Sequence, residues 1–168
     1  CSVIIQNFIG LDKDVSETDL VFDDRVFRTI RFARGSANAV WVTAVRYDTE
    51  EAWVYRSVDG GTSWSEHPIE VRSAGGMDVF VDVLVADAGD PDTAWVVMGP
   101  FLDDRLLKTT DGGESFSEVY ALDGDIVDGA QDAEGGIWLV INGGHVVYGP
   151  EDGEFEQVED APLSVGVQ

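Results

Sequence analysis

The octapeptide Ser57-Val58-Asp59-Gly60-Gly61-Thr62-Ser63-Trp64 returns later in the chain as Thr109-Thr110-Asp111-Gly112-Gly113-Glu114-Ser115-Phe116. Both copies place a hydroxyl residue, an aspartate, a glycine pair, a second hydroxyl residue and an aromatic residue in the same order. A third copy, which ends at Phe155, is one residue shorter before its aromatic and lacks the aligned aspartate. A spacing of roughly 40 to 50 residues is typical of repeat architectures such as propeller blades, so the sequence predicts an internal repeat.

The chemistry of the octapeptide favours a tight turn. An aspartate can accept hydrogen bonds from backbone N–H groups that follow it, and glycine permits the positive φ angles such a turn needs. The aromatic residue then leaves the turn and packs on the sheet. We therefore predict a structural role in a hairpin turn for Ser57, Asp59, Gly61, Ser63, Trp64, Thr109, Asp111, Gly113, Ser115 and Phe116, and in a degenerate turn for Glu151, Gly153 and Phe155.

Short apolar runs rich in Val, Ile, Trp and Tyr surround the turns, and helical periodicity is nearly absent. The expected strands are 28–33, 39–46, 52–57 and 67–71, then 79–86, 93–98, 105–109 and 117–122, then 126–131, 136–141, 145–148 and 155–158. Trp41, Trp95 and Trp138 each fall in the second strand of a unit. Core packing is the favoured interpretation of these tryptophans, since a place between neighbouring units suits a large apolar side chain.

The two intact octapeptides resemble the Asp-box, or BNR repeat, whose pattern is Ser/Thr-x-Asp-x-Gly-x-Ser/Thr-Trp/Phe. Similar repeats occur in β-propellers of sialidases, sortilin-like receptors, xyloglucan-degrading glycosidases and a photosystem assembly factor. The resemblance covers roughly residues 27 to 158. It implies blades of four antiparallel strands, with the box between the third and fourth strands on the outer rim. It leaves the function open, because these families share a scaffold and differ in chemistry.

The expected fold is therefore all-β, a β-propeller of about three to four blades, with a larger propeller as an open alternative. Blades with a box are expected at 27–73 and 74–123, and a blade with the degenerate box at 124–161. Residues 1–26 are expected to be leading strands, which complete a blade or belong to a preceding one. Residues 162–168 are expected to begin a further blade.

Charge and cysteine content exclude several functions. The chain has 33 acidic and 10 basic residues and a net charge of −23, so most of its surface would repel a nucleic acid. Cation binding, a high-salt habitat and simple solubility remain open, and a solvated acidic surface is the favoured interpretation. Cys1 is the single cysteine, so no intrachain disulfide or cysteine metal site is expected. No apolar run is long enough for a transmembrane helix.

Sequence patterns do not single out catalytic, cofactor or metal residues. The segment Phe27–Ile30 is similar to the Phe-Arg-Ile-Pro signature of sialidases but lacks its proline, and the arginines concentrate before the end of the first box. The many carboxylates make any pair uninformative for glycoside hydrolysis. The segment Asp87–Asp92 is an alternative calcium site, although its Gly and Pro favour a plain turn. His67 and His145 stand apart from any zinc ligand pattern.

The favoured function is a non-enzymatic binding or scaffold module of a secreted or cell-surface bacterial protein, which contacts protein or glycan through propeller loops. The first alternative is a fragment of an Asp-box glycosidase. The second is a structural subunit of a surface assembly, in which edge strands at 2–9 and 163–167 pair with neighbours. The expected location is extracytoplasmic. Cys1 is interpreted as an arbitrary chain end, with a lipid anchor on its thiol as the alternative.

Overall fold

The computed structural model describes residues 24–36, 38–70, 79–100, 103–150 and 153–158. Within these ranges every regular element is a strand. The first sheet holds β1 (Val26–Phe32), β2 (Val40–Arg46), β3 (Glu51–Ser57) and β4 (Ser65–Ile69). The second sheet holds β5 (Val79–Ala86), β6 (Ala94–Pro100), β7 (Asp104–Thr109) and β8 (Ser117–Leu122). The third holds β9 (Ile126–Gln131), β10 (Ile137–Ile141), β11 (His145–Gly149) and β12 (Glu156–Gln157).

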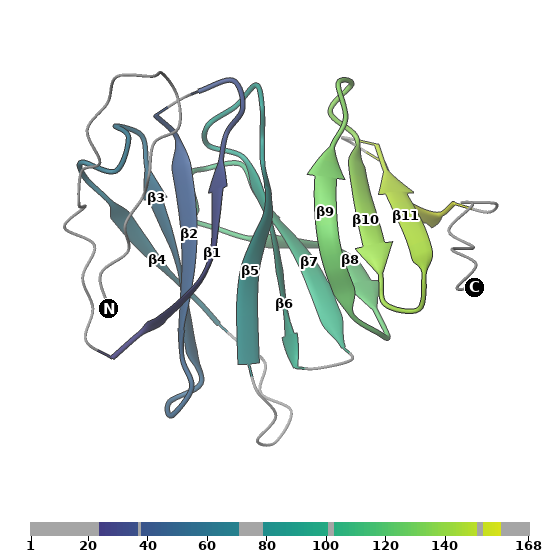
Figure 1. Cartoon of the computed structure of the whole chain (residues 1–168), viewed down its shortest axis with the longest axis horizontal. Helices are drawn as coiled ribbons and strands as arrows, with labels where there is room; N and C mark the ends of the chain where they lie inside the picture. The colour runs from purple at the N-terminus through teal and green to yellow at the C-terminus, as the bar shows by residue number, and fades with distance from the viewer. Residues whose placement is uncertain (1–23, 37, 71–78, 101–102, 151–152, 159–168) are drawn as a thin grey trace, which may run out of the picture.

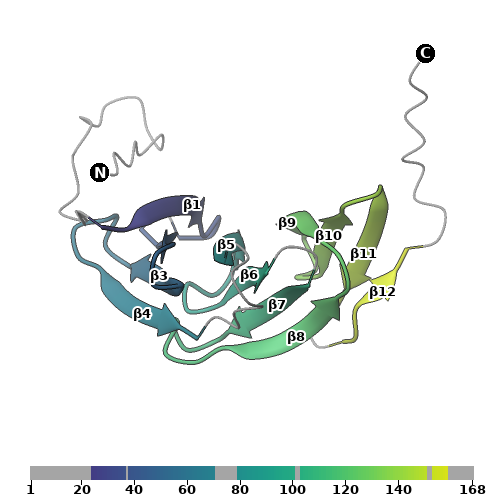
Figure 2. The ribbon, with the colours of Figure 1, turned by 90° about the horizontal axis from the view of Figure 1, so that it is seen from below.

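Each sheet is an antiparallel meander in which strands consecutive in the chain are hydrogen-bonded neighbours. The sheets stand side by side (Figure 1) and form an arc when seen from below (Figure 2). Strands β1, β5 and β9 lie on the concave side of this arc, and β4, β8 and β12 lie toward its outer side. The all-β architecture with four-stranded antiparallel sheets is confirmed.

Two apolar clusters join the sheets. The cluster between the first and second sheets includes Trp41, Val54, Val81, Val83 and Val96. The cluster between the second and third sheets includes Trp95, Leu106, Ile137, Leu139 and Val147. Because both faces of the second sheet are covered, β6 has a continuous apolar run instead of an alternating one. Burying each large apolar side chain contributes roughly 1.5–3 kcal/mol, so these clusters carry much of the stability.

The concave strands are also linked by polar contacts from sheet to sheet. The backbone N–H of Val83 donates to Thr29 Oγ1 at 2.8 Å. The Arg28 guanidinium donates two hydrogen bonds of 2.9 Å to the Asp82 carboxylate. Arg31 Nε donates to the Leu84 carbonyl at 3.1 Å. These contacts fix the register of β1 against β5.

Every observed strand overlaps a predicted one, and β5, β8 and β9 have the predicted bounds. The largest shift is in β4, which begins at Ser65 because its hairpin with β3 continues back to Arg56. Trp41 and Trp95 are buried as expected, whereas Trp138 is 41% exposed, so the core prediction is wrong for Trp138. The division into blade units stays a prediction. Residues 1–23 of the expected leading strands, with Cys1, and the segment 162–168 lie outside the described residues, and Val26 of the leading segment belongs to β1.

Candidate functional site

The first box closes the turn between β3 and β4 with its own side chains. Asp59 accepts hydrogen bonds from the Ser63 backbone N–H at 2.8 Å and from the Ser63 hydroxyl at 2.6 Å. The buried Ser57 hydroxyl donates to Asp59 at 2.8 Å and accepts from the Gly61 N–H at 2.8 Å. Trp64 Nε1 donates to the Gly61 carbonyl at 3.1 Å. The side chains of this box are thus hydrogen-bonded within the turn.

The second box has the same network. Asp111 accepts from the Ser115 N–H at 3.0 Å and from its hydroxyl at 2.5 Å, while the Thr109 hydroxyl donates to Asp111 at 2.8 Å. Gly113 N–H donates to Thr109 Oγ1 at 3.0 Å. Hydrogen bonds from Ser115 lower the pKa of Asp111 to about 2, and those from Ser63 lower the pKa of Asp59 to about 2. These aspartates are therefore ionised acceptors, which suits the structural role predicted for them.

The glycine pair of the second box also packs on the first sheet. A Cβ on Gly112 would lie 2.8 Å from Arg56 Nη1. A Cβ on Gly113 would lie 3.0 Å from His67 Cδ2 and 3.5 Å from Trp41 Cζ3. Gly113 has a φ of 99°, a conformation that residues other than glycine rarely adopt. The box thus combines turn formation with packing between sheets, a second role that sequence reasoning missed.

The degenerate third box is only partly described. Glu151 lies outside the described residues, and the Gly153 N–H donates to the Pro150 carbonyl at 3.1 Å. Phe155 packs on Tyr120 of the second sheet with ring centroids 5.3 Å apart. The aromatic position therefore keeps a packing contact even though the aligned aspartate is missing.

The alternative calcium segment forms a turn whose carboxylates accept hydrogen bonds from the protein. Asp87 accepts from the Asp90 N–H at 2.7 Å and from the Gln131 side-chain amide at 2.5 Å. Asp90 accepts from the Asp92 N–H at 3.0 Å, and Asp92 forms an ion pair with Arg56. Among the residues that the structure describes, no group of three or more His, Cys, Asp or Glu side chains is arranged to hold a metal ion.

Several of the arginines considered for a sialidase-like site, Arg28 and Arg46 among them, are bound to carboxylates of the chain itself. Arg28 binds Asp82, and Arg46 pairs with Glu51 at 2.8 Å. The Arg28–Asp82 pair joins the first and second sheets, whereas the Arg46–Glu51 pair lies within the first sheet. Holding a substrate carboxylate would require these guanidinium groups to leave their present partners.

Asp104 is the described acid whose pKa is raised, and it lies at the junction of the second and third sheets. Its residue exposure is 0%, and Oδ2 accepts the Ile126 N–H at 2.6 Å, while Oδ1 has no hydrogen-bond partner in the described chain. Burial, aided by the negative charges of Asp125, Asp103 and Asp82, raises its pKa to about 6. The Asp104 carboxyl thus links the second sheet to the third through its hydrogen bond with Ile126, and it is not exposed to a substrate in solution.

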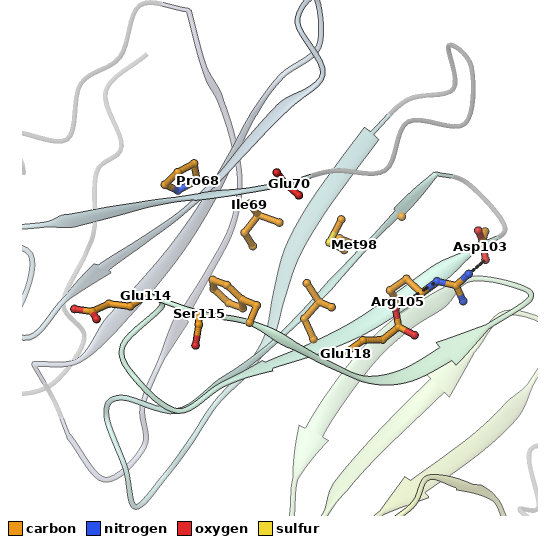
Figure 3. A pocket seen from close by; sticks show the side chains of 12 residues that line it. Pro68, Ile69, Glu70, Met98, Asp103, Arg105, Glu114, Ser115 and Glu118 are labelled. Carbon is orange, nitrogen blue, oxygen red and sulfur yellow. Dashed lines mark ion pairs between the residues drawn. The ribbon is translucent and has the colours of Figure 1, made fainter.

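A groove of about 390 Å³ opens between the outer strands of the first and second sheets (Figure 3). Its apolar lining consists of Ile69, Met98, Leu107 and Phe116. Acidic residues surround this lining: Glu70, Asp103, Glu114 and Glu118. Sequence reasoning did not identify the groove, because its residues are scattered over several strands and loops and share no motif.

Among the described residues that line the groove, Arg105 is the one cation, and it pairs with Asp103 at 2.7 Å and more loosely with Glu118 at 3.8 Å. Glu70 and Glu114 form no ion pair within the described part of the chain. The rim is therefore negative around an apolar centre. Such a surface favours a ligand that combines an apolar group with positive charge.

No protein-family model and no curated protein matches the chain. Among solved structures, "YCF48 bound to D1 peptide" is similar with a TM-score of 0.50 and 20% sequence identity over 84% of this chain and 46% of that chain. The GH74 enzyme of Niastella koreensis gives a TM-score of 0.37 and 11% identity over 78% of this chain and 30% of that chain. The chain thus spans about half the length of the YCF48 structure.

The likeness to YCF48 confirms the β-propeller fold predicted from the sequence. The four-stranded antiparallel sheets of this chain match that structure over most of this chain's length. In the part of the chain that the structure describes, no helix has the length and apolar character needed to cross a membrane.

Proposed function

We propose that this chain is a non-enzymatic binding module that holds a segment of a protein partner in the groove between the first and second sheets. The observation that carries the proposal is the groove itself, in which the apolar side chains of Met98 and Leu107 lie within a ring of carboxylates. The YCF48 structure contains a bound D1 peptide, so a fold of this kind holds a peptide in that protein. Both sheets that form the groove are fixed by the shared apolar cluster, which presents the rim in one geometry.

The charge distribution defines the partner segment. Glu70, Glu114 and Glu118 attract Lys or Arg side chains, while the apolar lining accepts an aliphatic or aromatic side chain between them. The net charge of −23 adds long-range attraction for a basic segment and accelerates its association at low salt. We therefore infer that the ligand is an apolar residue flanked by basic residues in an extended peptide.

Peptide display against the chain tests this proposal, followed by fluorescence anisotropy on the enriched peptides. The charge-reversal variant Glu114→Lys/Glu118→Lys should weaken their binding by about tenfold or more. The matched control Asp123→Lys/Glu134→Lys changes the net charge equally on exposed residues outside the groove lining and should have a much smaller effect. Equal losses in both variants, or no enriched peptides, would contradict a groove-based binding function.

A structural role in an assembly is the second candidate function, because the face of the third sheet that is turned away from the second sheet exposes Trp138 and Val140. The alternative of a glycosidase fragment has no comparable support among the described side chains.

The extracytoplasmic location and a lipid on Cys1 are further proposals. Intact mass spectrometry of the protein from its native source tests them, since a lipid-sized addition to Cys1 would establish an anchor.

A further inference from the structure

The hairpin between β10 and β11 (Figure 1) turns through Asn142–Gly143, which is the one Asn-Gly step in the sequence. The Gly144 N–H donates to the Ile141 carbonyl at 3.2 Å, so Asn142 and Gly143 occupy the central positions of a β-turn. Gly143 has a positive φ of 96°, as the second of these positions requires in a type II turn. Both central residues are exposed, so the tip of the hairpin is open to water.

An asparagine followed by glycine brings a neutral amide next to an unhindered backbone nitrogen. Attack of this nitrogen on the side-chain Cγ closes a succinimide ring, and glycine leaves the approach open because it has no Cβ. This reaction is one reason why asparagine is a thermolabile residue in proteins. The Gly143 N–H donates no hydrogen bond within the described chain, so no acceptor competes for its proton or holds its nitrogen in place.

The two Asp-boxes contain the related Asp-Gly step, and there the structure opposes the same attack. The Gly60 N–H donates to the Asn38 carbonyl at 3.0 Å, and the Gly112 N–H donates to the Asp92 carbonyl at 2.9 Å. Hydrogen bonds within each turn lower the pKa of the box aspartate to about 2, so its side chain is an ionised carboxylate, which is a poor electrophile. The nitrogen and the carbon that would react are thus both held back in the boxes, whereas neither is held back at Asn142–Gly143.

The side chain of Asn142 makes a contact that a carboxylate could not make. Asn142 Nδ2 donates to Asp125 Oδ2 at 3.1 Å, and the Asn142 N–H donates to the Asp125 carbonyl at 2.9 Å. A carboxylate at position 142 removes the side-chain donor and places two like charges side by side on neighbouring strands, which is destabilising. Asp125 directly precedes Ile126, whose N–H donates to the buried Asp104 at 2.6 Å. A new charge at the hairpin tip therefore acts beside the contact that links the second sheet to the third.

We propose that Asn142 is a site of spontaneous deamidation, which converts the exposed tip of the β10–β11 hairpin to aspartate or isoaspartate and loosens its contact with Asp125. The Gly143 nitrogen loses its proton to a base in solution and forms a bond to Asn142 Cγ, while the Cγ–Nδ2 bond breaks and ammonia leaves. Water then opens the succinimide. Addition of water at Cγ gives aspartate, and addition at the main-chain carbonyl carbon gives isoaspartate, whose backbone runs through the side chain. Neither step changes an oxidation state, and the inference does not depend on the peptide groove.

The test incubates the full chain at mildly alkaline pH in water that carries heavy oxygen, beside the free peptide 137–149 as an unfolded reference. Peptide mapping by mass spectrometry, with electron-transfer fragmentation, follows aspartate and isoaspartate at position 142. We expect the folded chain to react at a rate within about tenfold of that of the peptide, since exposed tips open at little cost in free energy. The product should carry one heavy oxygen atom from water. A rate below this range, or a product without heavy oxygen, overturns the proposal.

Three positions of the chain serve as controls for the rate. Asn142→Gln keeps an amide, but its longer side chain would have to close a larger ring, so this variant should stay unmodified at position 142. The Asp59–Gly60 and Asp111–Gly112 steps should stay free of isoaspartate in the same sample. Isoaspartate in the boxes at the rate of position 142 would show that the hydrogen bonds of the glycine nitrogens give no protection, and it would overturn the structural basis of the proposal.

The effect of the modification on the fold is tested with Asn142→Asp, which supplies the charge of the product without the isoaspartate backbone. Its thermal midpoint should lie below that of the wild type, because the hydrogen bond from Asn142 Nδ2 to Asp125 is lost and a like charge takes its place. The difference should shrink in an Asp125→Asn background, where the second charge is absent. A midpoint equal to that of the wild type, or the same loss in both backgrounds, overturns the coupling to Asp125.

Discussion

At the scale of single residues, Asp104 and the two box aspartates show how differently one side chain behaves in two surroundings. Burial raises the pKa of Asp104 to about 6, whereas hydroxyl and backbone donors lower the pKa of Asp59 to about 2. The sequence identified Asp59 because its motif specifies its donors. Sequence patterns did not distinguish Asp104 from the other acids, since the burial of that carboxyl depends on the third sheet packing beside β7.

Replacing Asp104 by Asn should stabilise the protein at neutral pH. The folded-state pKa of about 6 exceeds the usual 3.8, so the folded protein binds this proton more tightly than the unfolded chain does. Stability from the group is full below pH 3.8 and is lost as the pH rises through 6. Asp104→Asn, which keeps an acceptor for the Ile126 N–H, should gain about 1–3 kcal/mol at pH 7.5 and little at pH 4 in urea unfolding.

Asp123→Asn is the control for this measurement, because Asp123 is an exposed acid near the same junction. It should leave the unfolding free energy almost unchanged at both pH values. A loss of stability in Asp104→Asn at pH 7.5 would show that the charged carboxylate is needed and would contradict the assignment.

The box aspartates should respond to acid in the opposite direction. The folded-state pKa of Asp111, about 2, lies below the usual 3.8, so its contribution is present above pH 3.8 and is lost as the pH falls toward 2. Asp111→Ala should therefore lower the thermal midpoint at pH 7, and the difference from the wild type should shrink in melts at pH 2.5. A difference that is the same at both pH values would mean that the carboxylate charge contributes nothing to the turn.

At the scale of elements, the turns and strands were predictable because their determinants are local. Alternating or continuous apolar runs, interrupted by glycine-rich turns, located each strand of the described chain. The packing of Gly113 against His67 was not predictable, because it depends on how closely two sheets approach. The exposure of Trp138 was missed for the same reason, since its sequence context matches that of Trp41 and Trp95.

Gly113→Ala and Gly144→Ala together separate backbone strain from sheet packing. Gly113 and Gly144 have φ angles of 99° and 87°, so both substitutions cost about 1 kcal/mol of left-handed strain. A Cβ at Gly144 meets no atom within 4 Å, whereas one at Gly113 lies 3.0 Å from His67 Cδ2. Gly113→Ala should therefore lose about 1–2 kcal/mol more in urea unfolding. The excess should shrink in a His67→Ala background, and equal losses in the two glycine variants would contradict sheet packing by the box.

At the scale of the whole molecule, the chain combines a propeller scaffold with a strongly acidic surface. Composition alone predicted that surface and argued against a nucleic-acid partner. It did not predict where acids surround apolar groups, because Glu70, Glu114 and Glu118 come from two sheets and their loops. The groove therefore emerged only from the packing of the first sheet on the second.

The net charge of −23 predicts that salt stabilises the fold. Raising NaCl from about 10 mM to about 500 mM shortens the screening length severalfold and weakens repulsion among the acids, so the thermal midpoint should rise. No change in the midpoint with NaCl would show that the acidic surface does not destabilise the fold.

Thermal melts with divalent cations separate general screening from a calcium site. Because Asp87 and Asp90 accept hydrogen bonds from within their turn and Asp92 pairs with Arg56, CaCl₂ should raise the midpoint no more than MgCl₂ at equal ionic strength. An additional rise of the midpoint with calcium that is lost in Asp90→Asn would instead place a calcium ion in this turn.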